Sequence, residues 1–143
     1  MREIDLQTWA RRNVYGLFSD CDWPFYQVSF PLDVTNLRAY TKKEGLSFYF
    51  TLSWLLGMEQ QEAFLIRIRE GRLFVLDELM PSCTVLRPGE EVFRIISLPA
   101  GENPADFCRR AGALAQTQAA LYDEKTEGRD DLIYFCRGCR CCL

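Results

Sequence analysis

The chain has 143 residues, 48% of them hydrophobic and 26% charged, which is typical of one globular domain and excludes disordered, collagen-like and low-complexity chains. The net charge of −3 argues against a nucleic-acid-binding module, and no apolar run approaches the roughly 18 residues of a membrane-spanning helix. Residues 1–5 are charged and do not resemble a signal peptide, so we expect a cytoplasmic protein without a membrane partner.

The first 34 residues are expected to form a helix and a strand. Residues 6–18 carry apolar side chains at helical spacing and follow Asp5, a candidate helix cap. Residues 26–34 alternate and are rich in β-forming residues, which predicts a strand. Pro31 places the end of this strand at a sheet edge or a bulge.

Two further helices are expected before residue 60. Asp33 or Thr35 is a candidate cap for a short helix over residues 37–41, which Gly45 is expected to end. Residues 48–60 are apolar almost all round, a pattern that is typical of a buried helix rather than a surface one.

The second half of the chain combines short apolar runs with turn residues. This pattern predicts a hairpin over 64–69 and 72–77, strands over 83–86, 92–98 and 131–135, and a long helix over 104–122. The expected class is α+β, a two-layer sandwich with helices packed on a mixed, mostly antiparallel sheet.

The sequence contains no histidine. It therefore holds no Ser-His-Asp triad, no Cys-His pair and no HExxH zinc motif. Imidazole is also the group that enzymes use most often for acid–base catalysis, so any enzymatic reaction of these residues needs a different base.

Seven cysteines are present, an odd number that favours reduced thiols over a complete disulfide framework. Four of them lie in the tail, residues 136–143, whose composition differs from that of residues 1–135. The tail has three interpretations: a zinc site, a set of redox or regulatory thiols, or a terminus without function. Adjacent Cys141 and Cys142 are awkward as metal ligands, so we expect no metal site and no defined structure.

Several dispersed motifs occur in a fixed order along the chain. They are Trp9-Ala10-Arg11, which matches W-x-R; Asp33-Val34-Thr35, which matches D-[IV]-T; Phe48-Tyr49-Phe50, which is close to F-Y-P; Phe64 to Arg67, close to F-R-x-R; and Leu132 to Phe135, close to the strand before S-x-x-P-W. In this order and spacing they resemble the chloramphenicol acetyltransferase family over most of the chain.

This resemblance implies an activity and a set of site residues. The family transfers acetyl from acetyl-CoA, its co-substrate, to a hydroxyl of chloramphenicol, a small-molecule acceptor, and it forms trimers with sites at subunit interfaces. By the resemblance, the acceptor pocket would contain Leu17, Phe18, Trp23, Pro24, Phe93 and Ile95. The alternative is that these side chains belong to the core. Arg11, Asp33 and Thr35 would have structural roles, and Arg11 would pair with the Asp of H-H-x-x-x-D-G.

The sequence also departs from the family pattern. Phe50 replaces Pro, Leu65 replaces Arg, and Cys136 stands where the family has the oxyanion-stabilising Ser. The motif H-H-x-x-x-D-G, which carries the catalytic His, is absent. We therefore expect an incomplete acetyltransferase-like domain that is inactive alone and leaves Arg11 without its partner. A shifted reading frame or a shortened gene would explain this, and the DNA beyond Leu143 tests it.

Two other functions stay open at this point. One is a non-catalytic ligand-binding or interaction module that keeps the aromatic pocket. The other is a cysteine-rich metal or redox protein.

Overall fold

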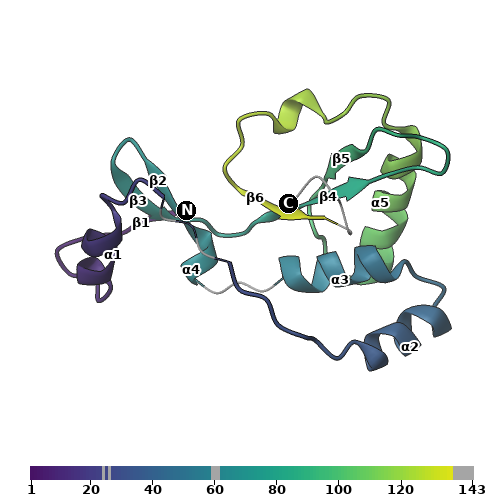
Figure 1. The fold of residues 1–143 in the computed structure, drawn as a ribbon, viewed down its shortest axis with the longest axis horizontal. Coiled ribbons are helices and arrows are strands. Elements are labelled where there is room, and N and C mark those ends of the chain that lie inside the picture. The colour runs from purple at the N-terminus through teal and green to yellow at the C-terminus, as the bar shows by residue number, and fades with distance from the viewer. Residues whose placement is uncertain (24, 26, 59–61, 137–143) are drawn as a thin grey trace.

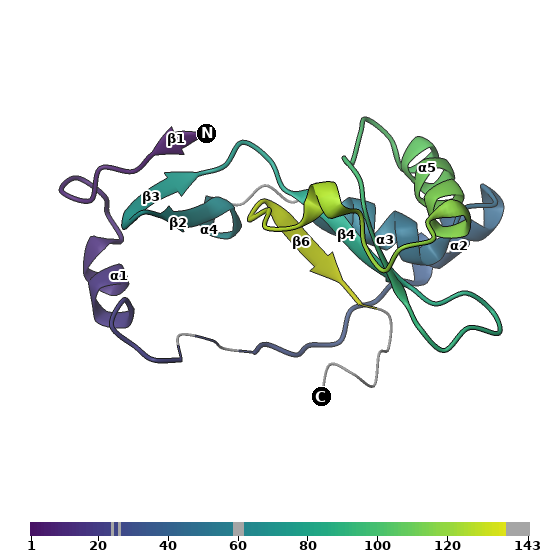
Figure 2. The ribbon, with the colours of Figure 1, turned by 90° about the horizontal axis from the view of Figure 1, so that it is seen from above.

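The structure is a computed structural model that describes residues 1–23, 25, 27–58 and 62–136. Two three-stranded sheets lie along the long axis of the molecule, with helices around them (Figures 1 and 2). The elements in chain order are β1 (Arg2–Glu3), α1 (Arg12–Phe18), α2 (Thr35–Lys43), α3 (Phe48–Gly57), α4 (Glu62–Leu65), β2 (Ile66–Arg69), β3 (Arg72–Val75), β4 (Met80–Val85), β5 (Arg94–Ser97), α5 (Pro104–Thr117), the 3₁₀ helix η1 (Glu124–Thr126) and β6 (Leu132–Phe135).

The first sheet has the order β1-β3-β2 and is antiparallel throughout. Its β2–β3 hairpin confirms the predicted turn, because Glu70 and Gly71 both have positive φ, at 51° and 73°. A two-residue turn of this kind matches the right-handed twist of the strands, and it favours Gly. A small core lies beside this sheet and contains Ile4, Leu65, Leu73, Val75, Leu76 and Leu79.

The second sheet has the order β5-β4-β6. β4 pairs antiparallel with β5 and parallel with β6, so Cys83 lies opposite both Ile96 and Phe135. The outer edge of β5 is covered, because Ile95 N–H donates to the carbonyl of Leu121 at 2.7 Å and the Gln118 amide donates back to the Ile95 carbonyl at 2.9 Å. Within the described part of the chain, β6 is therefore the open edge of this sheet.

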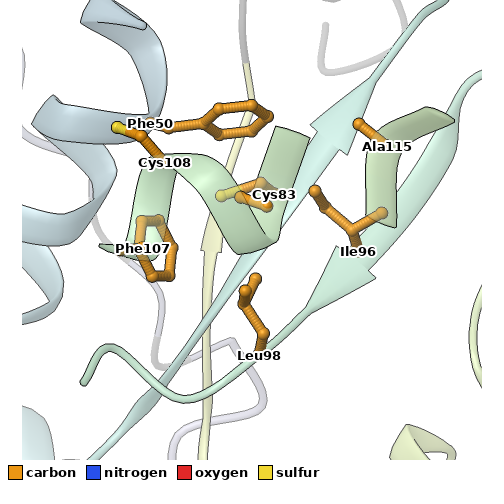
Figure 3. Close-up of a cluster of buried hydrophobic side chains, with 8 residues drawn as sticks. Phe50, Cys83, Ile96, Leu98, Phe107, Cys108 and Ala115 are labelled. Carbon is orange, nitrogen blue, oxygen red and sulfur yellow. The ribbon is translucent and has the colours of Figure 1, made fainter. Parts of the chain in front are cut away.

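Helices α3 and α5 pack on the second sheet and enclose the larger core (Figure 3). Its buried members are Phe50, Cys83, Ile96, Leu98, Phe107, Cys108, Ala111 and Ala115. Burial of a side chain as large as Phe107 stabilises a fold by about 1.5–3 kcal/mol. The close approach of α3 to β4 requires Gly57, since a Cβ there would lie 2.8 Å from Cγ of Pro81.

The α+β class is confirmed, and the second sheet is mixed as expected. The strands form two sheets, however, rather than one. The strand predicted for 26–34 is wrong for its described residues, 27–34, which belong to no strand. Apolar and polar residues do alternate along this segment, but a strand forms only where another strand pairs with it. Here the apolar side chains of Val28, Phe30 and Leu32 are exposed. No helix among the described residues is long and apolar enough to cross a membrane.

Two predicted helices are shorter than expected. α1 begins at Arg12, because Asp5 organises a separate turn in which its carboxylate accepts from Gln7 N–H at 2.9 Å. α5 ends at Thr117 instead of continuing to residue 122. The backbone of Gln118 is extended, and its side-chain amide donates to the Ile95 carbonyl of β5. α3 ends at Gly57, and the rest of its predicted range reaches residues 59–60, which lie outside the described part.

Candidate functional site

A cavity of about 530 Å³ opens between α3, the side of α2 and the end of β6. Its volume falls in the range of about 300–1,000 Å³ that is usual for small-molecule sites. It is lined by Arg38, Ser47, Phe48, Tyr49, Leu52, Ser53, Leu56, Phe135 and Cys136.

One face of α3 supplies most of the cavity wall. Phe48, Leu52 and Leu56 are spaced four residues apart, and helix geometry places such residues above one another. Ser47 caps this helix, since its hydroxyl accepts from Phe50 N–H at 3.3 Å. The wall is therefore part of a helix that is fixed at its start and packed on the core.

The end of β6 forms another part of the cavity wall. The carbonyl of Phe135 accepts two hydrogen bonds, one from the Tyr49 phenol at 2.8 Å and one from the Thr84 hydroxyl at 3.4 Å. The next residue, Cys136, is exposed and lines the cavity. The position that the family resemblance assigns to the oxyanion-stabilising Ser thus lies at a cavity wall.

The charges of the cavity are few. Burial raises the pKa of Tyr49 to about 12, which keeps the phenol protonated as a donor, and burial likewise raises the pKa of the Cys83 thiol beneath it. The Arg38 guanidinium lies 5.9 Å from the centre of the Phe48 ring and gives this side of the cavity a positive charge. Among its lining residues there is no carboxylate and no imidazole.

The structure separates the expected acceptor residues into two groups. Leu17, Phe18 and Trp23 are 71%, 55% and 82% exposed on and after α1. Phe93 and Ile95 are half-buried at β5. α1 and the β4–β5 region lie at opposite ends of the molecule (Figures 1 and 2), so one chain does not bring the two groups together. Pro24 lies outside the described residues.

The residues with expected structural roles lie at the starts of helices. The Asp33 carboxylate accepts from Thr35 N–H at 2.9 Å, and its pKa is lowered first by the Thr35 hydroxyl and then by this backbone bond. Arg11 is exposed directly before α1, and no ion pair joins it to any described residue.

The described part of the chain holds no group of three or more potential metal ligands. Cys139, Cys141 and Cys142, on which the zinc interpretation depends, lie outside that part.

Sequence reasoning missed the cavity itself. No motif in the sequence marks Arg38, Leu52 or Leu56, and Tyr49 belongs only to the segment that is close to F-Y-P. The four-residue spacing of Phe48, Leu52 and Leu56 is visible in the sequence, but it does not distinguish a cavity wall from core.

Comparison with known proteins covers most of the chain. Residues 1–128 match the family model described as chloramphenicol acetyltransferase. Chloramphenicol acetyltransferase 2 of Escherichia coli is 28% identical over 124 residues, which are 85% of this chain and 57% of that protein. The chloramphenicol acetyltransferase of Proteus mirabilis is 23% identical over 92 residues, which are 63% of this chain and 42% of that protein. The chain spans about half the length of the curated relatives it matches.

The fold also resembles that of a solved chloramphenicol acetyltransferase structure. A solved structure of a chloramphenicol acetyltransferase superposes with a TM-score of 0.79 at 17% identity, over 95% of this chain and 69% of that one. At this identity the superposition shows the fold alone, whereas the family model matches far more than half of the sequence. Because the family model matches residues 1–128, this chain belongs to the chloramphenicol acetyltransferase family.

Proposed function

We propose that these residues are part of an acetyl-CoA-dependent O-acetyltransferase that acts on chloramphenicol or a similar hydroxyl compound. The observation that carries this proposal is the exposed position of Cys136 on the wall of the 530 Å³ cavity, because the family resemblance assigns this residue to the oxyanion-stabilising Ser. A residue that stabilises the oxyanion must lie beside the acetyl carbonyl. We therefore place the acetyl end of acetyl-CoA in this cavity.

The walls of the cavity suit such a donor. The side chains of Phe48, Leu52 and Leu56 offer an apolar surface to the thioester arm of acetyl-CoA. Arg38 offers a cation to its phosphate groups, which guanidinium binds well. This division into an apolar wall and one charged group is common in small-molecule sites.

The acceptor site is proposed to lie between two copies of the chain. In one chain, Leu17, Phe18 and Trp23 lie far from Phe93 and Ile95, so a second copy is needed to complete a pocket from both groups. The family resemblance implies such an assembly, a trimer with sites at its interfaces. The proposed location is the cytoplasm, since an odd number of cysteines suits a reducing compartment.

These 143 residues alone are proposed to bind their ligands without turnover. A free alcohol is a poor nucleophile, and a general base contributes about 10²–10⁴ to such a reaction. No imidazole is available to serve as that base. Removing an oxyanion donor typically costs a further factor of about 10²–10³, and the thiol of Cys136 is a weak donor.

Two neighbouring leucines provide a matched test. Leu55 and Leu56 are both 44% exposed on α3, but only Leu56 lines the cavity. We expect Leu56→Asp to weaken acetyl-CoA binding at least about tenfold in calorimetric titration, because a carboxylate repels the phosphates and disrupts the apolar wall. Leu55→Asp should bind like the unchanged chain. Equal effects of both variants, or no binding to the unchanged chain, would contradict the proposal.

The alternative is a non-catalytic ligand-binding or interaction module. The observation that favours it is the exposure of aromatic side chains, above all Trp23 at 82%. Quenching of tryptophan fluorescence by chloramphenicol in a chain that does not bind acetyl-CoA would support this alternative over the acetyltransferase.

A further inference from the structure

Three hydrogen-bonding groups from distant parts of the sequence meet at the end of β6. The phenol of Tyr49, on α3, donates to the carbonyl of Phe135 at 2.8 Å across 86 positions of the chain. The hydroxyl of Thr84, on β4, donates to the same oxygen at 3.4 Å. One carbonyl is thus held from both the helix layer and the sheet layer.

This carbonyl lies at the end of a strand at the edge of the second sheet. β6 pairs only with β4 among the described strands, and Phe135 is its last residue. A parallel edge strand frays easily at its end, because one side of its ladder has no partner. The peptide bond that follows the Phe135 carbonyl carries residue 136 directly onto the cavity wall.

We propose that Tyr49 is a positioning residue: its phenol, assisted by the Thr84 hydroxyl, holds the Phe135 carbonyl and so fixes residue 136 beside the bound acetyl donor. This inference rests on the proposed function for the role of residue 136. A site of this kind requires its groups within about 0.5 Å of the productive geometry, which an edge strand alone does not guarantee.

The chemistry of Tyr49 suits such a role. A phenol on a helix that is packed on the core is a rigid donor, because only two side-chain torsions need to be fixed. Burial raises the pKa of Tyr49 to about 12, so the phenol keeps its proton, and with it the hydrogen bond, at neutral pH. The Tyr49 backbone is itself tied, since its carbonyl accepts from the Ser53 hydroxyl at 3.0 Å.

Hydrogen exchange measured by mass spectrometry tests the positioning directly. We expect Tyr49→Phe to accelerate amide exchange in residues 132–136 by about 2- to 12-fold, the range for loss of one hydrogen bond. Thr84→Val should have a smaller effect in the same segment. Tyr40→Phe is the matched control, since Tyr40 is an exposed phenol without a hydrogen bond to any described residue. Unchanged exchange in residues 132–136 would overturn the proposal, and so would equal acceleration in α5, which would assign Tyr49 to global stability.

A second measurement separates this inference from the proposed function. Cys136 can exchange with CoA disulfide, in which its thiolate attacks one sulfur, a protein–CoA disulfide forms and CoA thiolate leaves. The rate at Cys136 is read by peptide mass spectrometry, so that exposed Cys21 and the other cysteines do not contribute, and it is divided by the rate of the same residue with hydroxyethyl disulfide, which lacks the CoA groups. We expect a ratio above 1 for the unchanged chain and a lower ratio for Tyr49→Phe. A ratio of 1 in the unchanged chain would contradict the proposed donor site. The role of Tyr49 would still be decided by amide hydrogen exchange in residues 132–136. A high ratio that Tyr49→Phe leaves intact would overturn the positioning role.

Discussion

Replacing Arg87 by alanine should destabilise the fold, although Arg87 lies in a connection after β4. Its guanidinium donates to the carbonyls of Ala115 and Gln118, each at 2.6 Å. These carbonyls lie at the end of α5, where helix carbonyls have no partners within the helix and carry a partial negative charge. Arg87 therefore anchors α5 to the sheet that carries β6 and the cavity.

The size of the effect follows from these contacts. The Arg87 side chain is only 18% exposed, so water replaces the guanidinium poorly. A hydrogen bond to a charged group contributes about 1.5–3 kcal/mol. Gln118 is partly exposed, which lets water reach its carbonyl after the substitution. We therefore expect Arg87→Ala to lower the free energy of unfolding by about 2–4 kcal/mol, out of a typical total of about 5–15 kcal/mol.

Urea unfolding followed by circular dichroism measures this loss. With a slope of about 2 kcal/mol/M, the midpoint should fall by about 1–2 M without a change in slope. Arg109→Ala is the control, because Arg109 lies on α5 but is 75% exposed and, among the described residues, pairs only with Asp106 at the surface. A loss below about 0.5 kcal/mol for Arg87→Ala, or an equal loss for both variants, would refute this reasoning.

Three further outcomes are expected. Cys83 is fully buried and burial raises the pKa of its thiol, so iodoacetamide should label exposed Cys21 at least about tenfold faster in the native protein; comparable rates would show that the core is open. The hydrogen bond from Arg110 holds the pKa of Asp106 below its unfolded value, so the stability it provides is full above about pH 4 and is lost as the pH falls through the lower folded pKa. Asp106→Asn should flatten that part of the acid unfolding curve, and an unchanged curve would count against the pairing. The open edge of β6 should promote self-association in light scattering, which Tyr134→Lys should reduce, whereas a monodisperse monomer of the unchanged chain would contradict this expectation.

Local signals in the sequence were sufficient for most elements of the second half. The hairpin follows from two alternating runs around Gly71, and the start of α5 from Pro104 at the first helical position. The cap that accompanies it is the Asn103 side chain, which accepts from Asp106 N–H at 2.8 Å. Such elements are predictable because the residues that specify them are neighbours in the chain.

Features that depend on distant partners were not predictable in the same way. Residues 27–34 have the composition of a strand, but no composition states whether a partner strand is present. The parallel pairing of β4 with β6 joins segments about 50 residues apart and brings Phe135 beside Thr84, while the packing of α3 on the sheet brings Tyr49 to the same carbonyl. The cavity combines residues of α2, α3 and the end of β6, so its lining residues could not be identified before the fold was known.

The most direct test of the central claim is an acetyl-transfer assay on protein verified by mass to end at Leu143. Acetyl-CoA and chloramphenicol are supplied together, and release of free CoA is followed separately from formation of acetylated chloramphenicol. We expect binding of acetyl-CoA and no acetylated product above the uncatalysed rate, with at most slow CoA release as a cysteine thiolate takes the acetyl group. Steady formation of acetylated chloramphenicol at enzyme-like turnover would contradict it.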